Sequence, residues 1–434
     1  MSRYGLVLAG GGGKGAYQIG AWKALREMGI TFDAIAGASI GSINGALIAA
    51  GDYDKAIEMW KSVSLDKGVK INAPLPDPDN LFSKKNWGAL FREVIRNGGI
   101  DASPLNEYIK IYIDEKKIRE SNIPLGIITV QMGQKVNGLE LFIDEIPEGE
   151  LVDYLLASSS IPLVTNIGPD GEKFLDGGVY DNTPVMTLKK RGYNNLIVID
   201  IANIKGVAYN LNFANSRVVH IKPYDTDDLG AAFDFDPALT EKRMTMGYLD
   251  AKKAFGELSG NIFHFLPLVF RSFVQKYGAD EVYELEQLGH RLGLSLCEIY
   301  SEESFMFALK EAYEKEKAEL LAKEKAKEAE KAEKAEKSDK AEKAEKVEKA
   351  SKGEKPDIFD LFTRAARREK DEQADTSAQP SFPFPIISAV KEEETKEEET
   401  GHFNLAAIKN YFAQKKSNFE GFETAIDIIE KFSN

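Results

Sequence analysis

The sequence predicts an α/β fold in which a mostly parallel central sheet is flanked by helices. Over the first 255 residues, short apolar runs alternate with helical patterns, which is typical of parallel strands joined by crossover helices. Five buried strands are expected, at Tyr4–Ala9, Ala34–Ala36, Gly126–Val130, Asn195–Ile201 and Arg217–Ile221. Two of the helices between them are expected at Lys14–Met28 and Ile43–Ala50.

Length and charge limit the classes of function. The chain has 434 residues, 43% of them hydrophobic, and a formal net charge of −14. The length allows a sizeable core and more than one domain. The negative charge argues against nucleic-acid binding and against simple electrostatic capture by anionic lipid.

The expected compartment is the cytoplasm. Cys297 is the one cysteine, so no intramolecular disulfide forms and a reducing compartment fits. The start of the sequence lacks the pattern of a signal peptide, and no stretch approaches 18 uninterrupted apolar residues. Peripheral contact with the inner face of a membrane stays open.

Beyond a domain at residues 1–255, the composition predicts four further segments. Residues 256–312 are expected to form a helical extension that Pro267 kinks or divides. Residues 313–355 are rich in Glu, Lys and Ala, and each Glu of the repeat has a Lys four residues later, which favours a helix. A period of three does not keep the alanines on one face, so a coiled coil is not expected. A solvated helical spacer and a partly disordered charged linker are the two alternatives.

The last two segments form a charged, partly disordered C-terminal tail. Residues 356–402 are predicted to be a disordered linker with short apolar islands. Residues 403–434 are predicted to form amphipathic helices, which would dock on a membrane, on a protein partner or on the rest of the chain.

A glycine-rich loop, "GGGGKG" at Gly10–Gly15, follows the first predicted strand and opens a helix. Backbone N–H groups at such a turn bind anions, either a phosphate or the oxyanion of an acyl-transfer intermediate. The loop also matches the dinucleotide fingerprint G-x-G-x-x-G, and Asp33 lies near the position of a ribose-binding acid. A Walker A motif is excluded because Gly15, and not Ser or Thr, follows Lys14. A nucleotide- or dinucleotide-binding enzyme is therefore one alternative.

Ser39 lies between Gly37 and Gly41 in a G-x-S-x-G motif, after a predicted strand and before a helix. This context is typical of a nucleophile held on a sharp, strained turn. The positive end of the helix dipole favours negative charge at the hydroxyl. The alternative is an ordinary serine that caps the helix.

Asp176 precedes Gly177 and Gly178, a pattern that in isolation indicates a hairpin turn. A serine nucleophile, however, needs a base. None of the four histidines lies in a turn signal like the one around Ser39; they are His220, His264, His290 and His402. Asp176 is therefore a better candidate for the base than any histidine.

In order and spacing, the three motifs resemble those of the patatin-like phospholipases: G-G-G-x-[K/R]-G, then G-x-S-x-G, then D-G-[G/A]. Three further segments look like family sequence, Gly99–Leu105, Ala157–Val164 and Gly247–Ala254. The resemblance covers about residues 4–255. Ala9 stands where the family often has an aspartate.

The resemblance implies a three-layer fold and hydrolysis of lipid acyl esters without a metal or cofactor. Ser39 would attack the ester carbonyl, and Asp176 would take its proton and later activate water. The implied oxyanion loop comprises Gly10, Gly11, Gly12, Gly13, Lys14 and Gly15. In it the N–H groups of Gly11, Gly12 and Gly13 would hold the oxyanion, and Lys14 would fix the loop.

Two other hypotheses concern access and recruitment. Leu81, Phe82, Trp87, Leu90 and Phe91 cluster after a proline-rich stretch, as in a lid or membrane-facing patch, although a helix packed on the core is slightly preferred. The second alternative function is a non-catalytic scaffold whose C-terminal tail recruits a protein or membrane partner.

Overall fold

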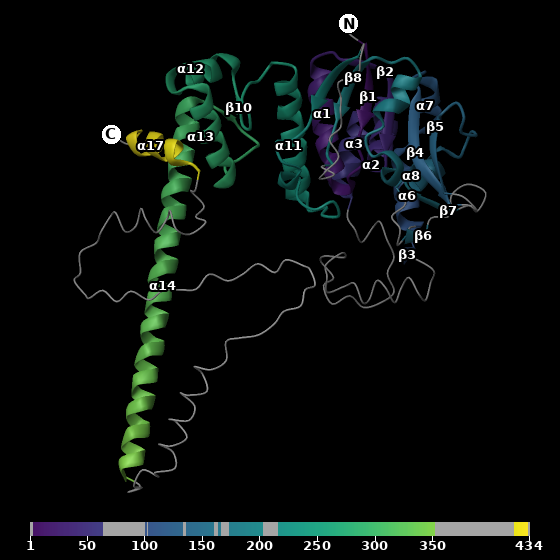
Figure 1. Ribbon diagram of the computed structural model, residues 1–434. Helices are drawn as coiled ribbons and strands as arrows, with labels where there is room; N and C mark the ends of the chain where they lie inside the picture. The colour runs from purple at the N-terminus through teal and green to yellow at the C-terminus, as the bar shows by residue number, and fades with distance from the viewer. Residues whose placement is uncertain are drawn as a thin grey trace, which may run out of the picture. The chain divides into compact units, whose positions relative to one another are not determined.

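The computed structural model describes residues 3–63, 100–101, 103–132, 136–159, 164–165, 173–202, 216–351 and 421–432. The chain divides into two compact units, residues 1–310 with 422–434 and residues 311–421. The first unit contains the sheet and all three glycine motifs (Figure 1). The apolar cluster at residues 81–91, considered as a lid or as a helix packed on the core, and the apolar islands of residues 356–402 lie outside the described residues.

The sheet is mostly parallel, as predicted. Its strands are β1 (Arg3–Leu8), β2 (Thr31–Ala38), β4 (Leu125–Met132), β5 (Val136–Phe142), β7 (Lys173–Asp176), β8 (Asn195–Ile199) and β9 (Arg217–Ile221). They follow the order β5-β4-β2-β1-β8-β9, and β7 also pairs with β4. The pairs among β4, β2, β1, β8 and β9 are parallel, whereas β5 and β7 run antiparallel to β4.

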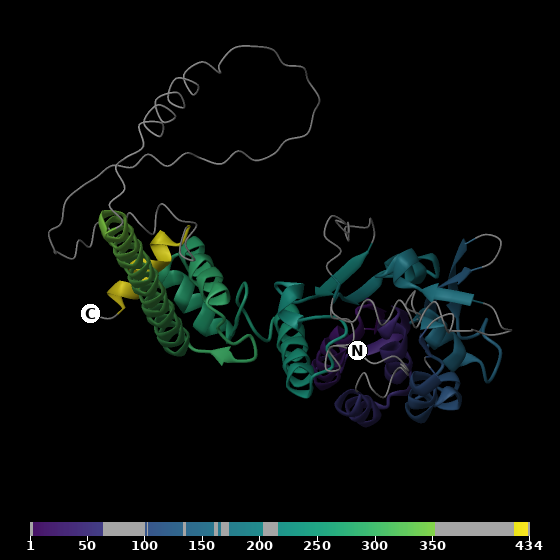
Figure 2. The same cartoon turned by 90° about the horizontal axis from the view of Figure 1, so that it is seen from below.

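Helices cover both faces of the sheet. They are α1 (Ala16–Glu27), α2 (Ile40–Ala50), α3 (Tyr53–Ser62), α6 (Ser103–Tyr112), α7 (Glu115–Glu120), α8 (Leu151–Ser158), α9 (Gly178–Asp181), α10 (Val185–Lys190) and α11 (Pro237–Ala254), with 3-10 turns η1 (Gly12–Gly15) and η4 (Thr226–Leu229). On one face, Val7 and Ala36 pack with Leu188 of α10. On the other, Leu8 and Ile35 point towards Gly45 of α2. The strands therefore lie inside three layers, as Figures 1 and 2 show.

Two glycines bring α1 and α11 into close contact. A Cβ added at Gly20 would lie 1.8 Å from the carbonyl oxygen of Met244, and one added at Gly247 would lie 1.9 Å from that of Tyr17. Any side chain at either position would push the helices apart. The close packing fastens α11 to the body that carries the glycine loop.

The helical extension has an aromatic core. It comprises β10 (His264–Phe265), α12 (Pro267–Tyr277), α13 (Ala279–Arg291), β11 (Ile299–Tyr300) and the start of α14 (Glu302–Ser351). Phe265, Phe273 and Phe305 are buried with their rings in mutual contact. Pro267 stands in the first turn of α12 and so divides the stretch, as predicted.

The last helix of the tail folds back on this extension. In α17 (Glu423–Lys431), Ala425 and Ile429 are buried, and the Ala425 N–H donates to Glu284 of α13 at 3.0 Å. Of the three docking surfaces considered for the tail, the structure therefore places this helix on the chain itself.

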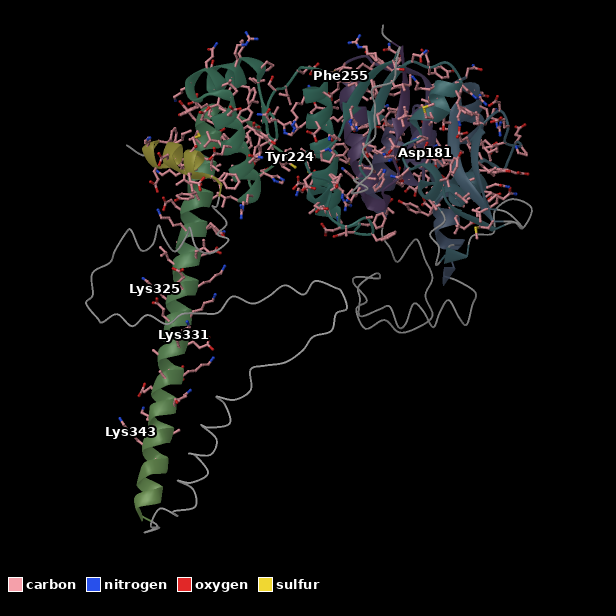
Figure 3. All side chains as sticks on the ribbon, viewed as in Figure 1. Asp181, Tyr224, Phe255, Lys325, Lys331 and Lys343 are labelled. Atoms are coloured by element: carbon pink, nitrogen blue, oxygen red, sulfur yellow. The ribbon has the colours of Figure 1, made fainter. Side chains whose placement is uncertain are left out.

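The repetitive Glu/Lys/Ala segment is helical as far as Ser351, within α14. Glu330 pairs with Lys334 at 2.6 Å and Glu333 with Lys337 at 2.5 Å, which is the spacing that supports an isolated helix. Lys325, Lys331 and Lys343 project away from the helix axis (Figure 3). No helix in the described part of the chain is both long and apolar enough to cross a membrane.

Candidate active site

Strand pairing brings Ser39 and Asp176 together. On one side of β4, Ile128 faces Ala38 of β2, and the next residue, Thr129, faces Asp176 of β7. Strand β2 thus pairs with β4 as far as Ile128, and β7 pairs with the same edge of β4 from Thr129 onward. Because Ser39 directly follows Ala38, the sheet sets the serine beside the aspartate although the two are far apart in sequence.

Ser39 has the strained backbone expected of a nucleophile turn. Its φ of 50° and ψ of −129° lie in a region that L-residues rarely adopt. A Cβ at Gly37 would lie 2.3 Å from the carbonyl oxygen of Gly41, and one at Gly41 would lie 2.4 Å from that of Leu8, so both positions need glycine. Ser39 occupies the N-cap position of α2, but its side chain makes no capping hydrogen bond. The hydroxyl is therefore not engaged as a helix cap.

The Ser39 side chain instead lies close enough to the carboxylate of Asp176 to influence its pKa. The Gly178 N–H donates to Asp176 Oδ1 at 2.7 Å. Burial raises the pKa of Asp176 above its ordinary value, while Ser39 and the hydrogen bond from Gly178 lower it by less. The carboxylate beside the hydroxyl is thus more basic than an exposed aspartate.

The glycine loop lies against this pair, since a Cβ built on Gly10 would be 3.1 Å from the Cβ of Ser39. Two of its N–H groups are already used outside the loop: Gly10 donates to the Asn182 carbonyl at 3.1 Å, and Gly13 donates to the Ala232 carbonyl at 2.5 Å. Within the loop, Lys14 N–H donates to the Gly11 carbonyl at 3.2 Å.

Gly11 and Gly12 differ from their neighbours, because their N–H groups meet no acceptor among the described residues. The φ of Gly12 is 58°, a conformation that favours glycine. The donors available to an anion are therefore two of the three that the resemblance implies, and Gly13 serves to fasten the loop.

Two cationic side chains, one from the loop and one from α11, fasten the loop to its surroundings. Lys14 Nζ donates to the Thr226 carbonyl at 3.0 Å. Arg243 is fully buried in α11 and donates to the Gly13 carbonyl at 3.0 Å. It also donates to the carbonyls of Leu229, Ala231 and Asp234 at 2.6–2.8 Å. Sequence reasoning missed Arg243, since nothing local marks a helical arginine that binds a loop so far away in the chain.

A buried polar network supports both ends of the loop. Gln18 Nε2 donates to the Ala9 carbonyl at 2.7 Å, and Asn44 Nδ2 donates to the Gly15 carbonyl at 3.0 Å. Asn44 also donates to Gln18 Oε1 at 2.8 Å and accepts from Trp60 Nε1 at 3.0 Å. Apart from polar residues within two buried helices, no feature of the sequence indicated this network.

Each of the three histidines that the structure describes lies beside a carboxylate other than Asp176. His264 pairs with Asp250 at 3.0 Å, His290 with Asp228 at 2.8 Å and His220 with Asp200 at 3.5 Å. His402 lies outside the described residues. In the described part of the chain, no cluster of three or more His, Cys, Asp or Glu side chains is placed to hold a metal ion.

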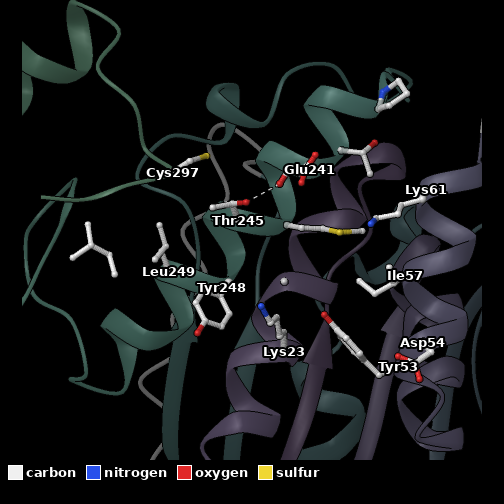
Figure 4. Close-up of a pocket in the computed structure, with 15 residues that line it drawn as sticks. Lys23, Tyr53, Asp54, Ile57, Lys61, Glu241, Thr245, Tyr248, Leu249 and Cys297 are labelled. Carbon is white, nitrogen blue, oxygen red and sulfur yellow. Dashed lines mark hydrogen bonds between the residues drawn. The ribbon is translucent and has the colours of Figure 1, made fainter. Parts of the chain in front are cut away.

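A groove of about 1110 Å³ lies on a different part of the unit, along α1, α3 and α11 (Figure 4). Tyr53, Lys61, Met244, Tyr248 and Cys297 are among the residues that line it. None of the residues of the three glycine motifs does so, and the groove is therefore separate from the Ser39–Asp176 site.

Comparison with known proteins agrees with this geometry. Residues 6–189, which include all three motifs, match the family model for patatin-like phospholipases. Residues 6–189 therefore carry a patatin-like phospholipase domain.

Relatives of the patatin-like domain are parts of much longer proteins. Lysophospholipase NTE1 of Eremothecium gossypii is 27% identical over 303 residues, which cover 66% of this chain and 18% of that protein. Lysophospholipase NTE1 of Candida glabrata is 30% identical over 204 residues, covering 46% of this chain and 10% of that protein. A patatin-like phospholipase domain-containing protein of Caenorhabditis elegans is also 30% identical over 204 residues, covering 46% and 14%. The chain thus matches less than a fifth of the length of each relative.

Proposed function

We propose that this protein is a serine lipid acyl hydrolase of the phospholipase A or lysophospholipase type, which cleaves carboxylic esters of membrane lipids. One observation carries the proposal: a serine on a strained turn lies beside a buried aspartate and next to two backbone N–H groups that meet no acceptor among the described residues. The names of the fungal relatives, lysophospholipases, support a lipid ester as the substrate.

In the first step, Ser39 Oγ attacks the ester carbonyl carbon while Asp176 takes the hydroxyl proton. The negative charge that develops on the carbonyl oxygen is held by the N–H groups of Gly11 and Gly12. One such donor is typically worth about 3 kcal/mol in the transition state. Collapse of the intermediate breaks the ester C–O bond, and Asp176 returns the proton to the leaving alcohol.

In the second step, water attacks the acyl-serine. Asp176 takes a proton from the water, the same loop holds the oxyanion, and the carboxylic acid leaves as Ser39 regains its proton. The aspartate acts as the base in both steps, and its raised pKa improves the match between base and hydroxyl.

The two alternatives fit the site less well. A phosphate in the glycine loop would compete with the Ala232 carbonyl, which already accepts the Gly13 N–H, and Lys14 is directed to Thr226. Asp33 lies near the start of β2 rather than at the end of a strand, where a ribose-binding acid is found. A scaffold would have no use for a serine–aspartate contact on a strained turn.

The experiment is fatty-acid release from lysophosphatidylcholine and from phosphatidylcholine vesicles. Ser39→Ala and Asp176→Asn should each lower release by a factor of about 100 or more, the usual size of a general-base contribution at its lower end. Asp181→Asn is the matched control, because Asp181 is a nearby carboxylate whose one hydrogen bond among the described residues is from the Thr183 N–H. A folded Asp176→Asn protein with the wild-type rate would overturn the proposal.

A further inference from the structure

Ser158 contacts the backbone of both halves of the proposed dyad. It is the last residue of α8 and is fully buried. Its Oγ accepts the Ser39 N–H at 2.9 Å and donates to the Ile128 carbonyl at 2.6 Å. Its own carbonyl accepts the Gly177 N–H at 3.0 Å, directly after Asp176.

The hydroxyl works as a bridge between two strands at the point where they part. Ile128 faces Ala38 in the ladder, and the chain leaves β2 at Ser39. There the Ser158 hydroxyl is inserted between the Ser39 N–H and the Ile128 carbonyl. A hydroxyl has one proton and two lone pairs, so donation to Ile128 orients a lone pair towards the Ser39 N–H.

The bridge acts on the peptide that carries the strain. Ser39 has a φ of 50°, and a residue in such a conformation persists only when its surroundings hold it there. On the other side, a Cβ added at Gly177 would lie 2.0 Å from the Ile128 carbonyl oxygen. The aspartate turn is thus packed directly on the group that Ser158 binds.

Resting on the proposed function, we propose that Ser158 is a positioning residue for acyl transfer: by holding the backbone at Ser39 and at Gly177, it fixes the nucleophile relative to Asp176. Ser158 does not touch the reacting atoms. Its effect is on geometry, and a small misplacement of a reacting group can cost about 100-fold in rate.

The test compares Ser158→Ala with Ser159→Ala. Within the described part of the chain, the Ser159 hydroxyl bonds to the Leu155 carbonyl of α8 at 3.1 Å and to no other group, so its removal controls for the loss of a serine. The measurements are the rate constant and the final extent of Ser39 labelling by a fluorophosphonate, with kcat and KM on lysophosphatidylcholine.

For Ser158→Ala we expect labelling and kcat to fall about 10- to 100-fold. KM and the number of serines finally labelled per folded molecule should stay within twofold of the control. A merely structural role would instead reduce the number of labelled sites and leave the turnover of each unchanged. Ser158→Thr restores the hydroxyl and should recover labelling to within about fivefold of wild type, even if its methyl group lowers the melting temperature.

If Ser39 is labelled at the same rate in the Ser158→Ala and Ser159→Ala variants, the positioning role is overturned and the proposed function is left intact. So would a loss of kcat that matches the loss of labelled sites. Wild-type protein that neither labels nor releases fatty acid would overturn the proposed function, and the inference about Ser158 with it.

Discussion

Replacing Asn44 by alanine should destabilise the first unit severely. Asn44 is fully buried in α2 and joins three partners: the Gly15 carbonyl, Gln18 Oε1 and Trp60 Nε1. Alanine can bond to none of them, and each partner would be left inside the protein without its hydrogen bond.

The cost follows from the number of orphaned groups. A buried polar group that loses its partner costs about 1–3 kcal/mol. With three such groups at the lower half of that range, about 1–2 kcal/mol each, the free energy of unfolding should fall by about 3–6 kcal/mol. The Gly15 end of the glycine loop would also lose its support, so kcat should fall more than KM changes.

The assay is urea unfolding followed by tryptophan fluorescence, to which the buried Trp60 contributes. Asn194→Ala is the control, since Asn194 is exposed and bonds only weakly to the Gly192 carbonyl at 3.3 Å. Its effect should be below about 0.5 kcal/mol. A loss of less than about 1 kcal/mol for Asn44→Ala would refute the account of the network.

Four further predictions concern the loop, the base and the tail. Arg243→Lys cannot reach the four carbonyls that the guanidinium binds, so we expect kcat to fall at least about tenfold and the melting temperature to drop by several degrees; an unchanged kcat would contradict the role of Arg243. Burial raises the pKa of Asp176, and the base must be ionised, so kcat should rise with pH through a limb above the ordinary value of 3.8; a limb at or below that value would be inconsistent. Because burial raises the pKa of Asp176 in the folded state, the fold loses stability as the pH rises from 3.8 through the raised pKa. Asp176→Asn, which carries no charge, should therefore melt no lower than wild type at pH 7. Ala425→Glu would bury a carboxylate between α17 and α13, and limited proteolysis should then remove the tail helix while kcat is kept, in contrast to Thr424→Glu at an exposed position.

The central strands and the two glycine turns were predictable because their signals are local. Apolar runs such as Leu6–Leu8 give buried parallel strands, and the small residues on both sides of Ser39 form a local pattern that is typical of a sharp strand-to-helix turn. The predicted start of the second helix at Ile43 was late, since α2 begins at Ile40, directly after the nucleophile turn.

The two antiparallel strands could not be predicted in the same way. β5 has a glycine and two acidic or amide residues among its seven, and β7 has four residues. Both strands are defined by their antiparallel pairing with β4, which their own sequences do not reveal. Yet the pairing of β7 with β4 is what brings Asp176 to Ser39. The motifs therefore allowed the dyad to be proposed, but they did not show how the fold brings its two residues together.

Residues that act at a distance were missed altogether. Arg243 binds a loop that lies 230 residues earlier in the chain, and Ser158 bonds across 119 residues to Ser39. Their partners are backbone groups, which leave no trace in the pattern of side chains. For the same reason, the engagement of the Gly13 N–H by Ala232 could not be seen before the structure.

The most direct test of the central claim is labelling with a fluorophosphonate, followed by mass spectrometry of the labelled peptide. An adduct forms readily only on an activated serine. We predict a single adduct on Ser39 in the wild-type protein, slow labelling in Asp176→Asn and none in Ser39→Ala. Folded wild-type protein that forms no adduct, or forms it on another serine, would contradict the assignment of Ser39 as the nucleophile.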